Sequence, residues 1–143
     1  MTSFKLDLIK LLIPSRKITN IKLKEEDAIC VQFANYLREI TLEKNFPFIW
    51  FHVPNQFAIS RPIFGLKQSW MGRIAGIPDY VFLGHRSFVM EFKSKTGRLS
   101  AVQQIVQSWC EKVNVPFYVA RNFEEGKEFV NSEWQKLNLN LQK

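Results

Sequence analysis

The sequence predicts an α/β fold in which helices flank a central mixed β-sheet, built from an antiparallel hairpin and a βαβ crossover. Short aromatic and β-branched runs at 46–55, 79–83, 87–93 and 116–121 have the character of strands. Longer segments with apolar residues at helical spacing separate or flank them. A chain of 143 residues that is 46% hydrophobic suits one domain with its own core.

The charge balance favours a polyanionic partner. Twenty Lys and Arg against 13 Asp and Glu give a formal charge of +7. Such a charge promotes nucleic-acid binding through steering and counterion release. Basicity alone does not decide, because many basic proteins bind no nucleic acid.

Cysteine usage and hydropathy predict an intracellular, cytoplasmic protein with no membrane partner. Cys30 and Cys110 lie far apart in predicted helices, which argues against a disulfide framework or a thiolate zinc site. No run approaches the ~18 apolar residues of a membrane span. The N-terminal apolar stretch is interrupted by Lys5, Asp7 and Lys10 and does not read as a signal peptide.

Two helices are expected before the first strand. Residues 4–12 predict a short amphipathic helix that ends at Pro14, within an N-terminal extension of residues 1–23. Residues 24–44 predict a longer helix with one packing face, made of Ile29, Phe33, Tyr36, Leu37 and Ile40.

The first turn of that longer helix carries acidic residues. Extending the packing face backward by three residues leads to Glu26. The simpler interpretation is that Glu25 and Glu26 favour the positive end of the helix dipole.

The first strand, 46–55, is closed by Pro54 and Asn55. The stretch 56–76 has weak periodicity and is interpreted as a long loop with at most one helical turn. Its basic and aromatic residues suit contact with phosphates and unstacked bases, although a solvated loop explains them nearly as well. These residues are Arg61, Lys67, Trp70 and Arg73.

A hairpin is predicted from 79–83 and 87–93 across the loop 84–86. In that register Leu83 faces Ser87 and Asp79 faces Glu91. Because side chains alternate along a strand, Glu91 and Lys93 share a face with Val89. The opposite, apolar face consists of Phe88, Met90 and Phe92.

This register brings two carboxylates together. Close carboxylates repel, so one stays protonated unless a cation lies between them. A hard divalent ion such as Mg²⁺ would supply that cation and keep waters able to attack a phosphate, with Lys93 beside them. The alternative is an ordinary salt bridge between Lys93 and one acid.

A helix follows with Ser100 as its N-cap. Its predicted packing face consists of Val102, Ile105, Val106, Trp109 and Val113. Gln103 has two interpretations, because Ser100-x-x-Gln103 is a capping box and the same glutamine, just after the strand that bears Glu91 and Lys93, could also reach the site.

The strand 116–121 completes a βαβ unit, whose crossover should be right-handed and whose strands should be parallel. A last helix over 123–137 is indicated by a second capping box, Asn122-x-x-Glu125. Residues 138–143 are expected to form a frayed tail.

Four motifs together resemble one nuclease family. They are HVPN at 52–55, GIPD at 76–79, EFK at 91–93 and GRLSAVQ at 97–103. The combination resembles the VRR-NUC (virus-type replication-repair nuclease) family of the PD-(D/E)XK nuclease superfamily, over residues 24 to 125. The resemblance implies a restriction-endonuclease-like core and a nuclease domain spanning 24–137.

The resemblance also implies residue roles. Asp79, Glu91 and the Phe92 backbone carbonyl would bind Mg²⁺ or Mn²⁺, with Glu26 as the acid of the first helix and Glu25 as its alternative. Lys93 would orient the attacking water or stabilise the transition state.

Further roles follow from position. Gln103 matches the glutamine that begins the helix after the motif strand, whereas Cys30 departs from the family, where a polar residue is expected. The DNA-binding residues would be Asn55, Arg61, Lys67, Arg73, Lys95 and Arg98.

The implied activity is metal-dependent phosphodiester hydrolysis by a structure-specific DNA endonuclease, similar to a Holliday junction resolvase. Such enzymes act as homodimers on branched DNA, and a small phage or mobile-element DNA-repair protein would fit the size of the chain. The alternatives are a flap, restriction-type or RNA-directed nuclease, and a non-catalytic nucleic-acid-binding module.

Overall fold

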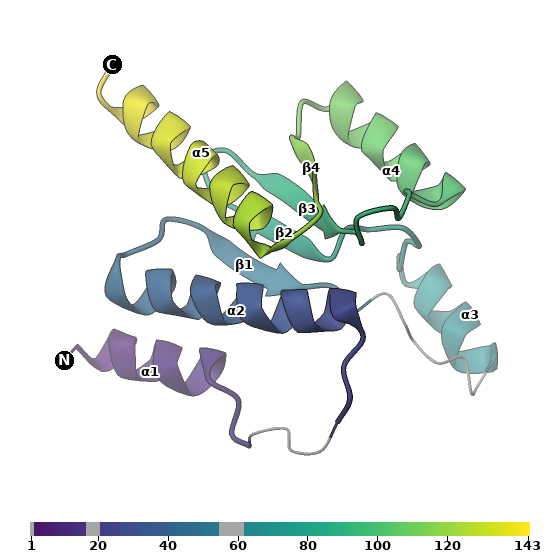
Figure 1. The fold of residues 1–143 in the computed structure, drawn as a ribbon, viewed down its shortest axis with the longest axis horizontal. Coiled ribbons are helices and arrows are strands. Elements are labelled where there is room, and N and C mark those ends of the chain that lie inside the picture. Colours follow the sequence, from purple (N-terminus) through teal and green to yellow (C-terminus); the bar gives the residue numbers. More distant parts are fainter. Residues whose placement is uncertain (1, 17–20, 55–61) are drawn as a thin grey trace.

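The computed structural model describes residues 2–16, 21–54 and 62–143. In chain order the elements are α1 (Ser3–Leu12), α2 (Glu25–Glu43), β1 (Ile49–His52), α3 (Pro62–Trp70), β2 (Tyr80–Leu83), β3 (Phe88–Phe92), α4 (Ala101–Lys112), β4 (Phe117–Ala120) and α5 (Phe123–Leu141). Figure 1 shows this arrangement. The predicted α/β class with a mixed sheet is confirmed.

The sheet has the strand order β1-β2-β3-β4. Its first three strands are antiparallel, and β4 is parallel to β3 through the α4 crossover. Tyr80 pairs with Met90 and Phe82 with Phe88, which is the predicted hairpin register. Continued by one residue, this register sets Asp79 opposite Glu91.

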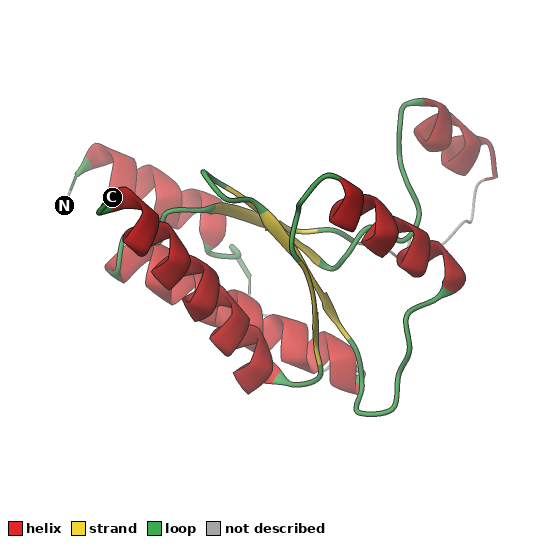
Figure 2. Cartoon of the chain, turned by 90° about the horizontal axis from the view of Figure 1, so that it is seen from above, coloured by secondary structure: helices red, strands yellow, loops and turns green. Residues whose placement is uncertain are grey.

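Helices cover the two sheet faces unequally. α2 and α5 lie on one face, and α4 lies on the other (Figure 2). The core between the sheet and helices α2 and α5 is aromatic, and the ring centroids of Phe82 and Phe88 are stacked 4.3 Å apart. Phe33 of α2 inserts edge-on against Tyr80 and Phe92. The strand face predicted to be apolar is therefore the core face.

α1 lies along α2 but buries none of its own residues. It is attached by polar contacts, because Arg38 Nε donates to the Leu12 carbonyl at 2.8 Å and Lys5 pairs with Glu43 at 3.5 Å. Within the described ranges, no helix is long and apolar enough to cross a membrane.

Two predictions of secondary structure were wrong, one about a loop and one about the end of the last helix. Residues 62–70 form the nine-residue helix α3 instead of a loop with at most one turn, and Pro62 at the first helical position favours this start. Asn55 and Arg61 lie outside the described residues. The predicted tail at 138–143 is helical as far as Leu141, because α5 continues past residue 137.

The second predicted capping box is incomplete. The Asn122 side chain accepts from the Glu125 N–H at 2.9 Å, as expected of an N-cap. The Glu125 carboxylate instead accepts from the Arg121 N–H at 2.7 Å, one residue before the cap. α5 therefore has its N-cap but not the reciprocal bond of a box.

The predicted packing face of α4 is mostly exposed. Only Val106 is buried, whereas the other four residues lie in solvent. The helix turns its Gln103 and Val106 side toward the sheet, so an apolar arc wider than the contact remains uncovered. The exposed members are Val102, Ile105, Trp109 and Val113.

Candidate functional site

The five residues predicted to carry chemistry meet at one end of the sheet. Asp79 immediately precedes β2, and Gln103 lies in the first turn of α4. Glu91 belongs to β3, and Lys93 immediately follows that strand. Glu26 reaches the same end from the first turn of α2. Residues separated by up to 77 positions in sequence thus surround one cluster, which we call the carboxylate site.

Asp79 and Glu91 are tied to each other's strands. The Asp79 N–H donates to Glu91 Oε2 at 3.1 Å, and the Phe92 N–H donates to Asp79 Oδ2 at 2.8 Å. These bonds replace the strand ladder where β2 begins, and they fix both carboxylates in place. Glu91 is only 3% exposed.

The surroundings of Asp79 disfavour its charged form. Burial, followed by the charge of Glu91, raises the pKa of Asp79 to about 7. The Phe92 N–H bond and the Lys93 charge act in the opposite direction without cancelling that rise. Near neutral pH the pair of carboxylates therefore tends to bind either a proton or another cation.

Lys93 supplies part of that charge. Its Nζ lies 2.8 Å from Glu91 Oε1, and its side chain is 16% exposed. The salt bridge considered as the simpler interpretation is thus present. It also holds the ammonium close enough for its charge to act on Asp79 as well.

Gln103 fulfils both of its predicted roles. Its Oε1 accepts from the Ser100 N–H at 2.9 Å, which completes the capping box. Its Nε2 donates to Glu91 Oε1 at 2.6 Å. The cap therefore aims the amide at the carboxylate site.

Glu26, and not Glu25, is the first-helix acid that faces the site. Glu26 Oε1 accepts from the Ser94 N–H at 2.9 Å, whereas Glu25 is exposed. Glu26 also adds to the charges that raise the pKa of Asp79. This bond joins the start of α2 to the chain immediately after Lys93.

Cys30, one turn further along α2, lies against the same cluster. Burial, and then the charge of Asp79, raises the pKa of the Cys30 thiol to about 12, so the thiol stays protonated. The Cys30 carbonyl accepts from the Tyr80 hydroxyl at 2.9 Å. The departure from the expected polar residue thus adds no charge to the site.

Sequence reasoning missed Arg121. Its Nη1 donates to the Ser94 carbonyl at 2.8 Å and also to the Gly97 carbonyl. These bonds hold the turn after Lys93, from which Lys95 and Arg98 extend into solvent. A signal was present, because Arg121 follows a strand parallel to β3 and parallel strands end at the same edge of a sheet.

Gly76 explains the first residue of the GIPD motif. Its φ is +80°, a conformation that glycine adopts readily. A Cβ there would lie 2.9 Å from the backbone carbon of Val102. Glycine thus lets the segment that leads into Asp79 pack directly on the turn that carries Gln103.

The donor set fits a hard divalent cation that keeps most of its waters. In the described part of the chain, no three His, Cys, Asp or Glu side chains form a group that could hold a metal ion by themselves. Asp79 and Glu91 form a pair, and Mg²⁺ is commonly held by one or two carboxylates with water in its other positions. The Phe92 carbonyl and Glu26 stay predicted ligands.

Positive charge is concentrated in the part of the chain that carries the site. Residues 44–110 contain eight Lys and Arg but only two Asp and Glu, namely Asp79 and Glu91. The rest of the chain has twelve against eleven. Nearly all of the net charge thus belongs to the segment that includes β1 and most of α4, and this excess favours a polyanionic partner.

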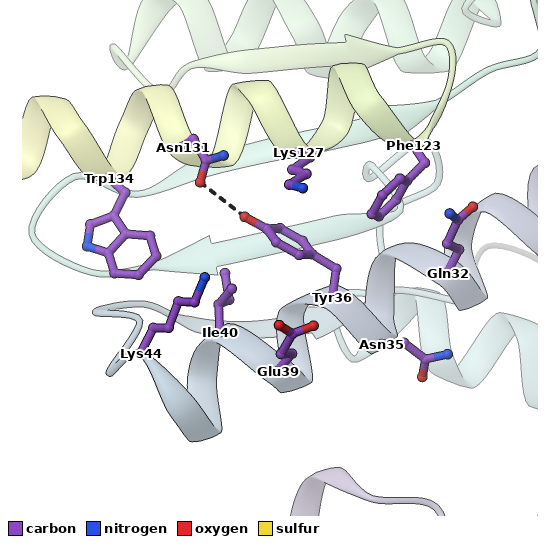
Figure 3. A pocket seen from close by; sticks show the side chains of 10 residues that line it. All are labelled: Gln32, Asn35, Tyr36, Glu39, Ile40, Lys44, Phe123, Lys127, Asn131 and Trp134. Atoms are coloured by element: carbon purple, nitrogen blue, oxygen red, sulfur yellow. Dashed lines mark hydrogen bonds between the residues drawn. The ribbon is translucent and has the colours of Figure 1, made fainter.

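A groove between α2 and α5 is a separate feature (Figure 3). It has a volume of about 390 Å³, and none of the five site residues lines it. Across it the Tyr36 hydroxyl donates to Asn131 Oδ1 at 3.0 Å, and Lys127 lies over the Tyr36 ring. We interpret the groove as a consequence of the packing of α2 against α5 and not as part of the carboxylate site.

Comparison with known proteins gives no relative for this chain: no family model matches it, and searches of curated proteins and of solved structures find no similar chain. The VRR-NUC resemblance therefore stays a prediction that rests on the motifs.

The raised pKa of Asp79 predicts a pH-dependent gain from Asp79→Asn in the absence of metal. Folding raises the pKa of Asp79 from 3.8 to about 7, so its contribution to stability is lost as pH rises between those values. The neutral variant should be more stable than the wild type above pH 7, by about 1–2 kcal/mol once partial exposure is allowed for. Urea unfolding in EDTA at pH 8 and pH 4 measures this, and an equal difference at both pH values would contradict it.

Proposed function

We propose that this protein is a metal-dependent endonuclease of the PD-(D/E)XK type, similar to the VRR-NUC family. The observation that carries the proposal is the pair Asp79 and Glu91 with Lys93 2.8 Å from Glu91, at one end of a mixed sheet. We assign the sheet and its helices to a restriction-endonuclease-like core.

The chain's own residues would divide the work. Asp79 and Glu91 would hold the ion, and Gln103 keeps Glu91 in one orientation through its 2.6 Å bond. Mg²⁺ or Mn²⁺, when bound, would lower the pKa of a bound water and offset charge on the scissile phosphate. Lys93 would orient the attacking water or stabilise the negative charge that develops on the phosphate in the transition state. Cleavage would leave a 5′ phosphate.

A nucleic acid is the proposed substrate, because the segment with excess positive charge carries the site. The resemblance to the VRR-NUC family points to DNA. Lys95 and Arg98 are exposed beside Lys93, where they can contact neighbouring phosphates. Lys67 and Arg73 belong to the same positively charged segment, on and after α3. By its resemblance the protein would act on branched DNA as an intracellular homodimer that cuts two symmetric strands.

Cleavage of labelled substrates tests the proposal. A four-way junction, a flap, a linear duplex and a single strand are incubated with Mg²⁺, with Mn²⁺ or with EDTA. Symmetric nicks in the junction that require metal support a resolvase, and cutting of the flap or duplex alone would keep the nuclease while changing its substrate.

A nucleic-acid-binding module without catalysis is the competing function. It would use the same charged segment but would not require two buried carboxylates beside a lysine. Binding of all substrates with no metal-dependent cutting of any of them would favour it over a nuclease.

A further inference from the structure

Helix α3 is an arm attached directly beside the carboxylate site. It lies between β1 and β2, and Asp79 immediately precedes the strand after it. The Val53 N–H, at the end of β1, donates to the Asp79 carbonyl at 2.8 Å, so the segments on both sides of the arm meet at the site. Figures 1 and 2 both show α3 standing apart from the other helices.

The apolar side of α3 points away from the protein. Ile63, Leu66 and Trp70 recur three and four residues apart and so share one face. Ile63 and Trp70 are each 83% exposed, whereas the opposite face, with Gly65 and Gln68, is half-buried. A helix of a globular protein normally turns such a stripe toward its core.

Nothing in the described part of the chain covers this outward stripe extensively. Among the described residues, α3 forms no extensive contact with another helix or strand. Met71 and Ile74, which follow the helix, are exposed as well. An exposed apolar surface of this kind commonly marks a site of interaction.

The charge around the stripe selects the class of partner. Residues 44–78 contain no Asp or Glu, and Lys67 lies on the helix surface next to Ile63 and Trp70. A partner must therefore offer anions together with apolar faces. Nucleic acid with unstacked bases offers both, and it is the partner that the neighbouring carboxylate site would cut.

We propose that α3 is a substrate arm that recognises interruptions of a duplex, with Trp70 stacking on a base exposed at a branch or an unpaired end. Ile63 and Leu66 form the apolar surface beside it, and Lys67 contacts an adjacent phosphate. Apolar side chains inserted at base steps are an established way in which proteins hold distorted DNA. The inference rests on the proposed function and names the feature of the substrate that the arm reads.

Trp70→Ala tests the arm, with Trp109→Ala as its matched control. Both indoles are exposed, 83% and 53%, so neither change should affect folding, which circular dichroism checks. Affinity is measured in EDTA by fluorescence anisotropy for a four-way junction and for a linear duplex of the same length. We expect Trp70→Ala to weaken junction binding about tenfold, the typical value of one stacked base, and to leave duplex binding within about twofold.

Lys67→Ala supplies the second readout. Because a phosphate contact carries no information on structure, this variant should weaken junction and duplex binding equally and lower the salt dependence by about one ion. Trp109→Ala should change neither affinity.

Four results would overturn the inference, and they are distinguishable. If Trp70→Ala binds the junction as well as the wild type does, α3 is not a substrate arm, and the proposed nuclease function is unaffected. If the wild type binds no nucleic acid, both the arm and the proposed function are rejected. If the wild type is a dimer and Trp70→Ala is a monomer, α3 binds a second copy of the chain. If the wild type binds anionic phospholipid vesicles and Trp70→Ala does not, while junction binding is kept, α3 binds a membrane surface.

Discussion

Glu91→Gln is expected to lower the rate of metal-dependent DNA cleavage by on the order of 10³-fold or more. The substitution keeps the size of the side chain and an oxygen able to accept from Gln103 or from the Asp79 N–H. It removes the negative charge that we propose binds the ion. Single-turnover cleavage of the junction in Mn²⁺, at enzyme excess, measures the effect.

Binding separates this loss from damage to the fold. In EDTA, Glu91→Gln should bind junction DNA as well as or better than wild type, because a negative charge near the phosphates is gone. Glu111→Gln is the control, since Glu111 is exposed on α4 at a distance in sequence from the site. Cleavage by Glu91→Gln at the rate of Glu111→Gln would exclude Glu91 from the chemistry.

Glu133→Ala is expected to cost about 3 kcal/mol of unfolding free energy. Glu133 of α5 is fully buried, and Arg86 Nε lies 2.9 Å from its Oε2 while Lys136 Nζ lies 3.3 Å from its Oε1. The Tyr118 hydroxyl donates to the same carboxylate. Removing the shared partner leaves the half-buried Tyr118 hydroxyl without its acceptor, leaves Arg86 and Lys136 without their counter-charge, and opens a cavity in the core.

Urea unfolding of Glu133→Ala beside Glu128→Ala measures this cost, because Glu128 is an exposed acid on the same helix. Burial and the bond to Glu133 raise the pKa of Tyr118, so spectrophotometric titration should show that pKa falling in Glu133→Ala. A stability within 0.5 kcal/mol of wild type would mean that the buried charge cluster contributes nothing net.

The site was predictable because it depends on strand alternation and register. Phe88, Met90 and Phe92 can face only the core, which sends Glu91 and Lys93 to the other side. The short loop after Leu83 then sets Asp79 against Glu91. Gln103 follows from the helix cap, whose position is marked by Ser100.

The outer parts of the molecule were less predictable because nothing buries them. Among its described side chains, α3 buries none in the core, so burial did not impose a clear apolar face on this stretch of the sequence. The stretch was therefore interpreted as a loop. In α4 the apolar face is wider than the part of the helix that the sheet covers. The sequence therefore does not say which of its apolar residues are buried. Arg121 acts through backbone carbonyls of a turn, which leave no signal in side-chain spacing.

Binding of Mn²⁺, followed by electron paramagnetic resonance, tests the central claim that Asp79 and Glu91 form a metal site. Wild type and Lys93→Ala are titrated at pH 8 with junction DNA, beside the double variant Asp79→Asn/Glu91→Gln. The account predicts protein-dependent Mn²⁺ binding in the first two and its loss in the double variant, with Lys93→Ala inactive in cleavage. Equal Mn²⁺ binding by the wild type and the double variant would contradict it.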